Sequence, residues 1–163
     1  MRKKRVAYTL LALSVLLVYS AGRCWAVIDI TATGGWSRTI NGSDLNPPYT
    51  AGSDLNPTYE SSSNAVVIDI SGTAGDWAVT VRKEDTWPGN LQLYIKRASD
   101  GSCTGTISNG TTYRELTGID SGFFNGSTDC GNINIQLKIE LTGTPRIISP
   151  GVYSSTVTYT VTG

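Results

Sequence analysis

The sequence predicts an antiparallel β-sandwich, and three observations indicate this fold. Ser, Thr, Gly and Asn make up 65 of the 163 residues, a composition that suits strands and turns because Thr is β-branched and Gly and Asn supply turn dihedrals. Several short segments alternate apolar and polar residues with the period of a half-buried strand. Turn dipeptides separate these segments, and no helical pattern lies between them. One domain of this type can bury a full core within the available length.

The first 26 residues have the layout of a secretory signal peptide. Residues 2–5 are all basic, residues 6–18 are apolar, and residues 24–26 place small side chains at the −3 and −1 positions of a cleavage site after Ala26. The apolar run is shorter than the roughly 20 residues that a membrane-spanning helix needs. We therefore expect an exported protein that is secreted or displayed at the cell surface.

Removal of this segment changes both the net charge and the number of cysteines. Eight basic and thirteen acidic residues remain, so the mature chain carries a net charge of about −5, which repels nucleic acid. Of the three cysteines, Cys103 and Cys130 stay in the mature chain. Outside the cytosol such a pair is expected to form a disulfide. The chain has no histidine, and we predict no metal site.

The clearest strand runs over residues 132–141, where every second residue from Ile133 to Leu141 is apolar. Shorter segments repeat the pattern at Val66/Ile68/Ile70, Trp77/Val79/Val81 and Leu91/Leu93/Ile95. A last strand over residues 152–162 is expected to turn Tyr153, Val157, Tyr159 and Val161 inward. Turns are predicted at Pro88-Gly89, Asp100-Gly101, Asn109-Gly110, Asn125-Gly126 and Pro150-Gly151.

A ten-residue duplication stands before the first internal strand. GSDLNPPY at 42–49 recurs as GSDLNPTY at 52–59, and two copies are too few for a solenoid. The segment has little apolar patterning, so we interpret it as a duplicated surface loop. Asp44 and Asp54 are candidate calcium ligands, but aspartates and asparagines around proline more commonly cap turns.

The absence of histidine excludes Ser-His-Asp and Cys-His catalysis. Hydrolysis of glycosides by a pair of carboxylates is the one enzyme mechanism that the composition still allows. The candidate residues are Glu84, Asp85, Glu115, Asp120, Asp129 and Glu140. No spacing links any two of them, so we predict no enzyme and no cofactor. Trp36 and Trp87 are candidates for stacking against a sugar, whereas the alternation places Trp77 in the core.

The layout resembles the pilin subunits of the chaperone–usher type, including their spore-coat-U-like branch. The likeness lies in the signal peptide, the alternating segment after it, the single disulfide and the closing stretch PGVYSSTVTYTVTG at 150–163. It implies an immunoglobulin-like sandwich that lacks its last strand and is completed by a donor strand from the next subunit. Residues 27–35 would then be the N-terminal extension, with Ile28, Ile30 and Ala32 as its inserting face, and residues 36–163 the sandwich.

Two functions follow as expectations. The first is a secreted structural subunit of a pilus-like fibre, which assembles with copies of itself and passes through a periplasmic chaperone and an outer-membrane usher. The alternative is a solitary adhesive or carbohydrate-binding sandwich that uses Trp36 and Trp87.

Overall fold

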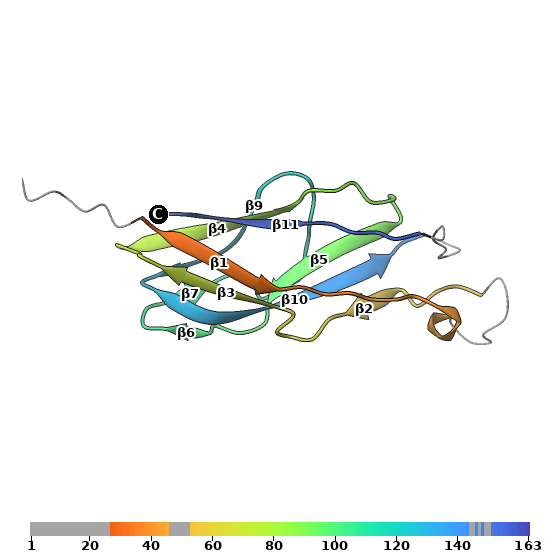
Figure 1. Cartoon of the computed structure of the whole chain (residues 1–163), viewed down its shortest axis with the longest axis horizontal. Helices are drawn as coiled ribbons and strands as arrows, with labels where there is room; N and C mark the ends of the chain where they lie inside the picture. Colours follow the sequence, from red (N-terminus) through yellow and green to blue (C-terminus); the bar gives the residue numbers. More distant parts are fainter. Residues whose placement is uncertain (1–26, 46–52, 144–145, 147, 149–150) are drawn as a thin grey trace, which may run out of the picture.

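The computed structural model describes residues 27–45, 53–143, 146, 148 and 151–163, and the predicted signal peptide lies outside them. These residues form two antiparallel sheets packed together, which confirms the all-β sandwich (Figure 1). Their elements are, in order, β1 (Asp29–Gly34), the 3-10 helix η1 (Gly42–Asp44), β2 (Thr58–Glu60), β3 (Val66–Ser71), β4 (Asp76–Lys83), β5 (Leu91–Arg97), β6 (Ser102–Cys103), β7 (Ile107–Ser108), β8 (Arg114–Glu115), β9 (Ser121–Ser127), β10 (Cys130–Leu141) and β11 (Val157–Thr162). No helix among them is long and apolar enough to span a membrane.

The larger sheet has the order β1-β3-β10-β5-β8, with β2 and β6 also paired to β10, and the smaller sheet has the order β11-β4-β9-β7. In immunoglobulin-like sandwiches one sheet carries strands A, B, E and D, and the other carries C, F and G. The order β1-β3-β10-β5 matches A-B-E-D, and β4 beside β11 matches C-F, whereas β9 and β7 of the smaller sheet have no counterpart in this seven-strand scheme. Within the described part of the chain, no strand pairs with the outer edge of β11.

The core confirms the alternation predicted for β3, β4, β5 and β10. Each apolar position named for β3, β4 and β5 is buried, and so are Ile133, Ile135, Leu137 and Leu141 of β10. Trp77 is buried as expected, with its ring edge-to-face with Phe124 at a centroid distance of 5.9 Å and its indole nitrogen donating to the Thr128 carbonyl at 2.8 Å. Burial of each such large apolar side chain stabilises the fold by roughly 1.5–3 kcal/mol.

The turn predicted at Asn125-Gly126 is wrong, because both residues lie inside β9. A Cβ on Gly126 would lie 2.6 Å from the Trp77 ring, so the glycine serves close packing against tryptophan instead of a turn. The strand was not predicted from the sequence because Phe123 and Phe124 are adjacent and both buried, which breaks the alternation of apolar and polar residues. A register shift between Val79 and Thr80 of the partner strand accommodates this break in alternation.

The last strand is shorter than expected. It begins at Val157, and its apolar side chains from Val157 to Val161 pack partly buried against the main core, as the alternation predicted. Tyr153 lies before the strand and packs instead against a satellite cluster formed by Tyr59, Leu91 and Leu141.

The duplicated segment is not only a surface loop. Its second copy ends in β2, where Tyr59 is buried and opposite Ile139 of β10. The three-residue strand is too short to show a period in the sequence. The equivalent leucines of the two copies, Leu45 and Leu55, form an antiparallel bridge with each other.

The two repeated aspartates each pair with an arginine. Asp44 is buried, forms an ion pair with Arg38 and takes part in a capping box with Asn41 at the start of η1. Asp54 forms an ion pair with Arg146 at 3.2 Å. Their carboxylate oxygens therefore already have protein donors, which fits the interpretation of Asp44 as a turn cap better than that of a calcium ligand.

The disulfide between Cys103 and Cys130 is confirmed. It joins β6 to β10 at directly opposed positions, with a Cα–Cα distance of 4.3 Å. Its presence fits an oxidising compartment.

We expect the Cys103→Ala/Cys130→Ala double variant to unfold at lower urea concentration than the wild type. The bond closes a loop with a sequence separation of 27, which is worth roughly 3 kcal/mol in the chain-entropy treatment. Equilibrium urea denaturation of the secreted protein measures the difference. Intact mass provides the control, because a mature chain that begins at Val27 should be lighter by two hydrogens than its reduced form. Equal urea midpoints would contradict the expected stabilisation.

Candidate functional site

The first strand lies along one side of the sandwich, at the edge of the larger sheet. β1 forms the edge of the larger sheet, and among the described strands it pairs with β3 alone, where Ile30 is opposite Ile70 and Ala32 is opposite Ile68. It lies beside β11, the edge of the smaller sheet, and the start of β1 is next to the end of β11 (Figure 1). A Cβ on Gly163 would lie 3.6 Å from Cδ1 of Ile28. The two edge strands, one from each sheet, therefore lie side by side along the same side of the sandwich.

The predicted inserting face of β1 contacts the core only in part. Ile28 and Ile30 are half-buried and pack against the main cluster, whereas Ala32 is exposed. In the structure β1 pairs with β3 of its own chain, and its inward face packs against the chain's own core. Insertion of the same face into a second copy stays a prediction.

Two glycines let the chain approach closely at the two ends of the β1–β3 pair. Gly34 has a φ of 105°, and a Cβ there would lie 2.4 Å from the Ala65 carbonyl oxygen. Gly72 has a φ of 70°, and a Cβ there would lie 2.5 Å from the Val27 carbonyl oxygen. Both positions therefore require glycine for conformation and for space.

Side chains at the end of β4 and directly after it form contacts with β11. The Glu84 carboxylate accepts a hydrogen bond from the Thr158 hydroxyl and pairs with Arg82, which also pairs with Asp120 at 3.1 Å. The hydrogen bond from Thr158 and then that from Arg82 lower the pKa of Glu84. The Tyr159 hydroxyl of β11 is buried and has no hydrogen-bond partner among the described residues, and burial raises its pKa.

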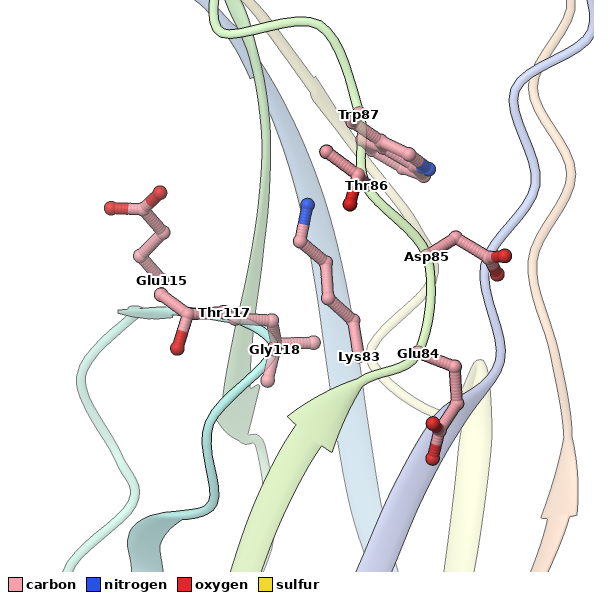
Figure 2. A pocket seen from close by; sticks show the side chains of 9 residues that line it. Lys83, Glu84, Asp85, Thr86, Trp87, Glu115, Thr117 and Gly118 are labelled. Atoms are coloured by element: carbon pink, nitrogen blue, oxygen red, sulfur yellow. The ribbon is translucent and has the colours of Figure 1, made fainter.

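A second feature is a hollow of about 250 Å³ between the loop that follows β4 and the loop that follows β8. Figure 2 shows the ammonium end of Lys83 between Thr117 on one wall and Trp87 on the other. The Lys83 Nζ lies 5.1 Å from the Trp87 ring centroid, and the indole nitrogen donates to the Ser154 carbonyl at 3.0 Å. Trp36 packs half-buried against the core and is not among the lining residues. The two predicted tryptophans therefore do not line this hollow together.

The structure brings three of the candidate carboxylates to the rim of this hollow: Glu84, Asp85 and Glu115. Glu84 and Asp85 point toward β11, away from Glu115 (Figure 2). Asp85 accepts from the Thr156 backbone nitrogen at 3.3 Å. The remaining candidates contact other partners: Asp120 pairs with Arg82, Asp129 accepts from Thr73, and Glu140 pairs with Lys138.

Sequence reasoning missed Gly72 and Lys83. Gly72 directly follows the alternation of β3, and an isolated glycine at a strand end is a signal for close backbone approach. Lys83 continues the inward positions of Trp77, Val79 and Val81 by one step, and a charge on that face marks the point where the strand leaves the core. Comparison with family models, curated proteins and solved structures finds no match to this chain.

We expect Gly72→Ala to loosen β1, with Gly75→Ala as its control. Alanine at a left-handed position costs about 1–2 kcal/mol, and its Cβ would contact the Val27 carbonyl. A Cβ on Gly75, in contrast, would have no atom within 4 Å, and Gly75 has no left-handed φ. Amide hydrogen exchange should show faster exchange in β1 for Gly72→Ala alone. Equal protection in the two variants would contradict this role of Gly72.

We also expect the docking of β11 to weaken in acid. The pKa of Glu84 is lowered in the folded state, so its contribution is present above the unfolded pKa of about 4.3 and is lost as the pH falls through the folded value. Urea midpoints measured from pH 7 down to pH 3 should fall less steeply for Glu84→Gln than for the wild type. Asp120→Asn serves as a control, because Asp120 is the other carboxylate that pairs with Arg82 but does not bind Thr158. Parallel pH curves for wild type and Glu84→Gln would show that the hydrogen bond from Thr158 adds no stability.

Proposed function

We propose that the protein is a secreted structural subunit of a cell-surface fibre and that copies assemble by exchanging β1. The observation that carries the proposal is the position of β1 at the edge of the larger sheet, beside an outer edge of β11 with which no described strand pairs. Exposed strand edges are templates for the addition of a further strand. The signal-peptide pattern and the disulfide support an extracellular location.

Exchange of β1 costs little because the contacts are the same in one chain and between two. The strand leaves β3 by breaking six residue pairs and withdrawing the half-buried Ile28 and Ile30. The same bonds and contacts re-form when β1 of another copy takes the vacated place. Swapping of an identical element is a low-cost route to assembly for this reason.

The segment after β1 is suited to carry the strand away. Residues 35–41 form no regular secondary structure, and most of their side chains are exposed. Gly35 has open space around its Cα, and its amide donates to the Ala65 carbonyl at 2.8 Å. Extension of these residues, which also withdraws the half-buried Trp36 from the core, would move β1 from its own domain to a neighbour.

The direction of exchange decides between a fibre and a dimer. If each copy gives its β1 to the next, the contact is head-to-tail and extends without closing; if two copies exchange β1 mutually, the result is a closed dimer. The resemblance to chaperone–usher pilins favours the first. By the same resemblance, a periplasmic chaperone would protect the β1 side of the sandwich before assembly and an outer-membrane usher would export the subunits.

The A-B-E-D and C-F order of the strands also supports the proposal. In an immunoglobulin-like sandwich strand G pairs with F, so its place would lie along the outer edge of β11, on the side where β1 lies. A β1 from another copy that takes the vacated place of β1 can therefore pair with β3 on one side and lie against β11 on the other.

We expect a Thr33→Cys/Val67→Cys variant to report where β1 pairs. Thr33 and Val67 are directly opposite on β1 and β3. Oxidation therefore joins the two introduced cysteines within one chain if β1 pairs with its own β3, and between two chains if β1 is exchanged. Non-reducing gels of protein from the surface of producing cells should show a ladder that reducing agent collapses. A single band with an internal bond under all conditions would show a solitary sandwich.

A charge on the inward face of β1 should stop assembly. Ile30→Asp places a carboxylate against the apolar cluster, whereas Thr33→Asp places the same charge at an exposed position of the same strand. Electron microscopy and sedimentation should show fibres for wild type and Thr33→Asp but none for Ile30→Asp or for a deletion of residues 27–33. As a control, each variant should be detected outside the cell with its Cys103–Cys130 disulfide formed, which shows that it was exported. Assembly of the deletion variant would overturn the exchange of β1.

A further inference from the structure

We propose that the hollow beside Trp87 binds a sugar that carries a carboxylate, of the uronic acid class. The hollow lies in the loops at the end of β4, and the site is independent of the exchange of β1. Its chemistry comes from one ammonium group, one fixed aromatic ring and hydroxyl and carboxylate groups on the two walls.

The ammonium group of Lys83 is available to a ligand. Among the described residues it has no carboxylate within ion-pair distance, and its contact is the Trp87 ring at 5.1 Å. The neighbouring Arg82, in contrast, is engaged by Glu84 and Asp120. A ligand carboxylate at Lys83 would form a charge-assisted hydrogen bond beside an aromatic wall.

The Trp87 ring is held in position for stacking. Its indole nitrogen donates to the Ser154 carbonyl, and its half-buried ring packs against the core clusters. A ring fixed in this way loses little side-chain entropy on binding. The apolar C–H face of a sugar ring can then pack against it without reorganisation of the loop.

The opposite groups match the hydroxyls of a sugar. Thr86 and Thr117 line the hollow on its two loops, and Glu115 lies on the far wall, away from Lys83 (Figure 2). Threonine hydroxyls donate and accept hydrogen bonds, and a carboxylate accepts them. A few placed polar groups around an aromatic surface are typical of small-ligand sites.

The volume of the hollow and the net charge of the chain restrict the class of sugar that can bind. The volume of about 250 Å³ lies below the roughly 300–1,000 Å³ of pockets for drug-sized ligands, so it accommodates one ring at a time. The mature chain is acidic overall, with eight basic and thirteen acidic residues, which disfavours long polyanions. A single acidic residue within or at the end of a largely neutral glycan fits both limits.

The test uses methyl β-D-glucuronide as the probe and methyl β-D-glucoside as its neutral match. Saturation-transfer NMR, which observes the ligand, gives dissociation constants for the mature protein whether it is monomeric or assembled. We expect saturable binding of the glucuronide and at least about tenfold weaker binding of the glucoside, since one charge-assisted hydrogen bond is lost. Equal binding of the two probes would overturn the recognition of a carboxylate.

Two matched pairs of variants locate the site. Lys83→Gln is compared with Lys96→Gln, because Lys96 also lies over an aromatic ring but on Tyr113. Trp87→Ala is compared with Trp36→Ala, because both tryptophans are half-buried and only Trp87 lines the hollow. We expect an approximately tenfold or greater loss in Lys83→Gln and Trp87→Ala and none in their controls. Absence of saturable binding, or equal effects within each pair, would overturn the proposal. A cooperative urea transition measured for each variant verifies that it is folded.

Discussion

The fold depends on the pairing of β10 along both of its sides. This twelve-residue strand pairs with β3 and β2 on one side and with β5 and β6 on the other. Its inward residues, among them the fully buried Ile133 and Ile135, form the floor of the core against β4 and β9. Its first residue, Cys130, carries the disulfide to β6. A shift of β10 by one residue would turn its whole apolar set outward, so the register of the larger sheet is set here.

The two sites described above are linked through the segment that leads into β11. Ser154 accepts from Trp87, Thr156 donates its amide to Asp85, and Thr158 donates to Glu84. Three residues of the loop after β4 thus bind alternate residues of one segment, so the Trp87 ring and the edge of β11 share a support. In the β1 segment, by contrast, the contacts with the core come from Ile28 and Ile30. The edge formed by β11 is therefore held by side chains of the loop after β4 in addition to its pairing, whereas the edge formed by β1 depends on its pairing with β3 and on two isoleucines.

Much of the fold could be predicted because burial in a sheet with one wet face is a period-two pattern. Ile68, Val79, Ile95 and Ile135 show this pattern in the sequence and are fully buried in the structure. Strands of two or three residues, such as β2 and β6, were missed because they are too short to show a period. Contacts such as that of Glu84 with Thr158 join residues 74 positions apart, and no local pattern encodes them. The apolar face of β1 was visible in the sequence, but its pairing with β3 depends on tertiary register.

The bridge between Leu45 and Leu55 has a consequence for how this chain could have grown. A tandem duplication of ten codons normally adds a stretch of backbone with no partner, which a compact domain must solvate. Here Leu45 of the first copy and the equivalent Leu55 of the second form an antiparallel bridge, so the two copies pair with each other at this position. The repeated aspartates are bound by Arg38 from the preceding segment and by Arg146, which lies 92 residues after Asp54. The two copies thus connect an early and a late part of the polypeptide through two ion pairs, and the second copy adds β2 to the larger sheet.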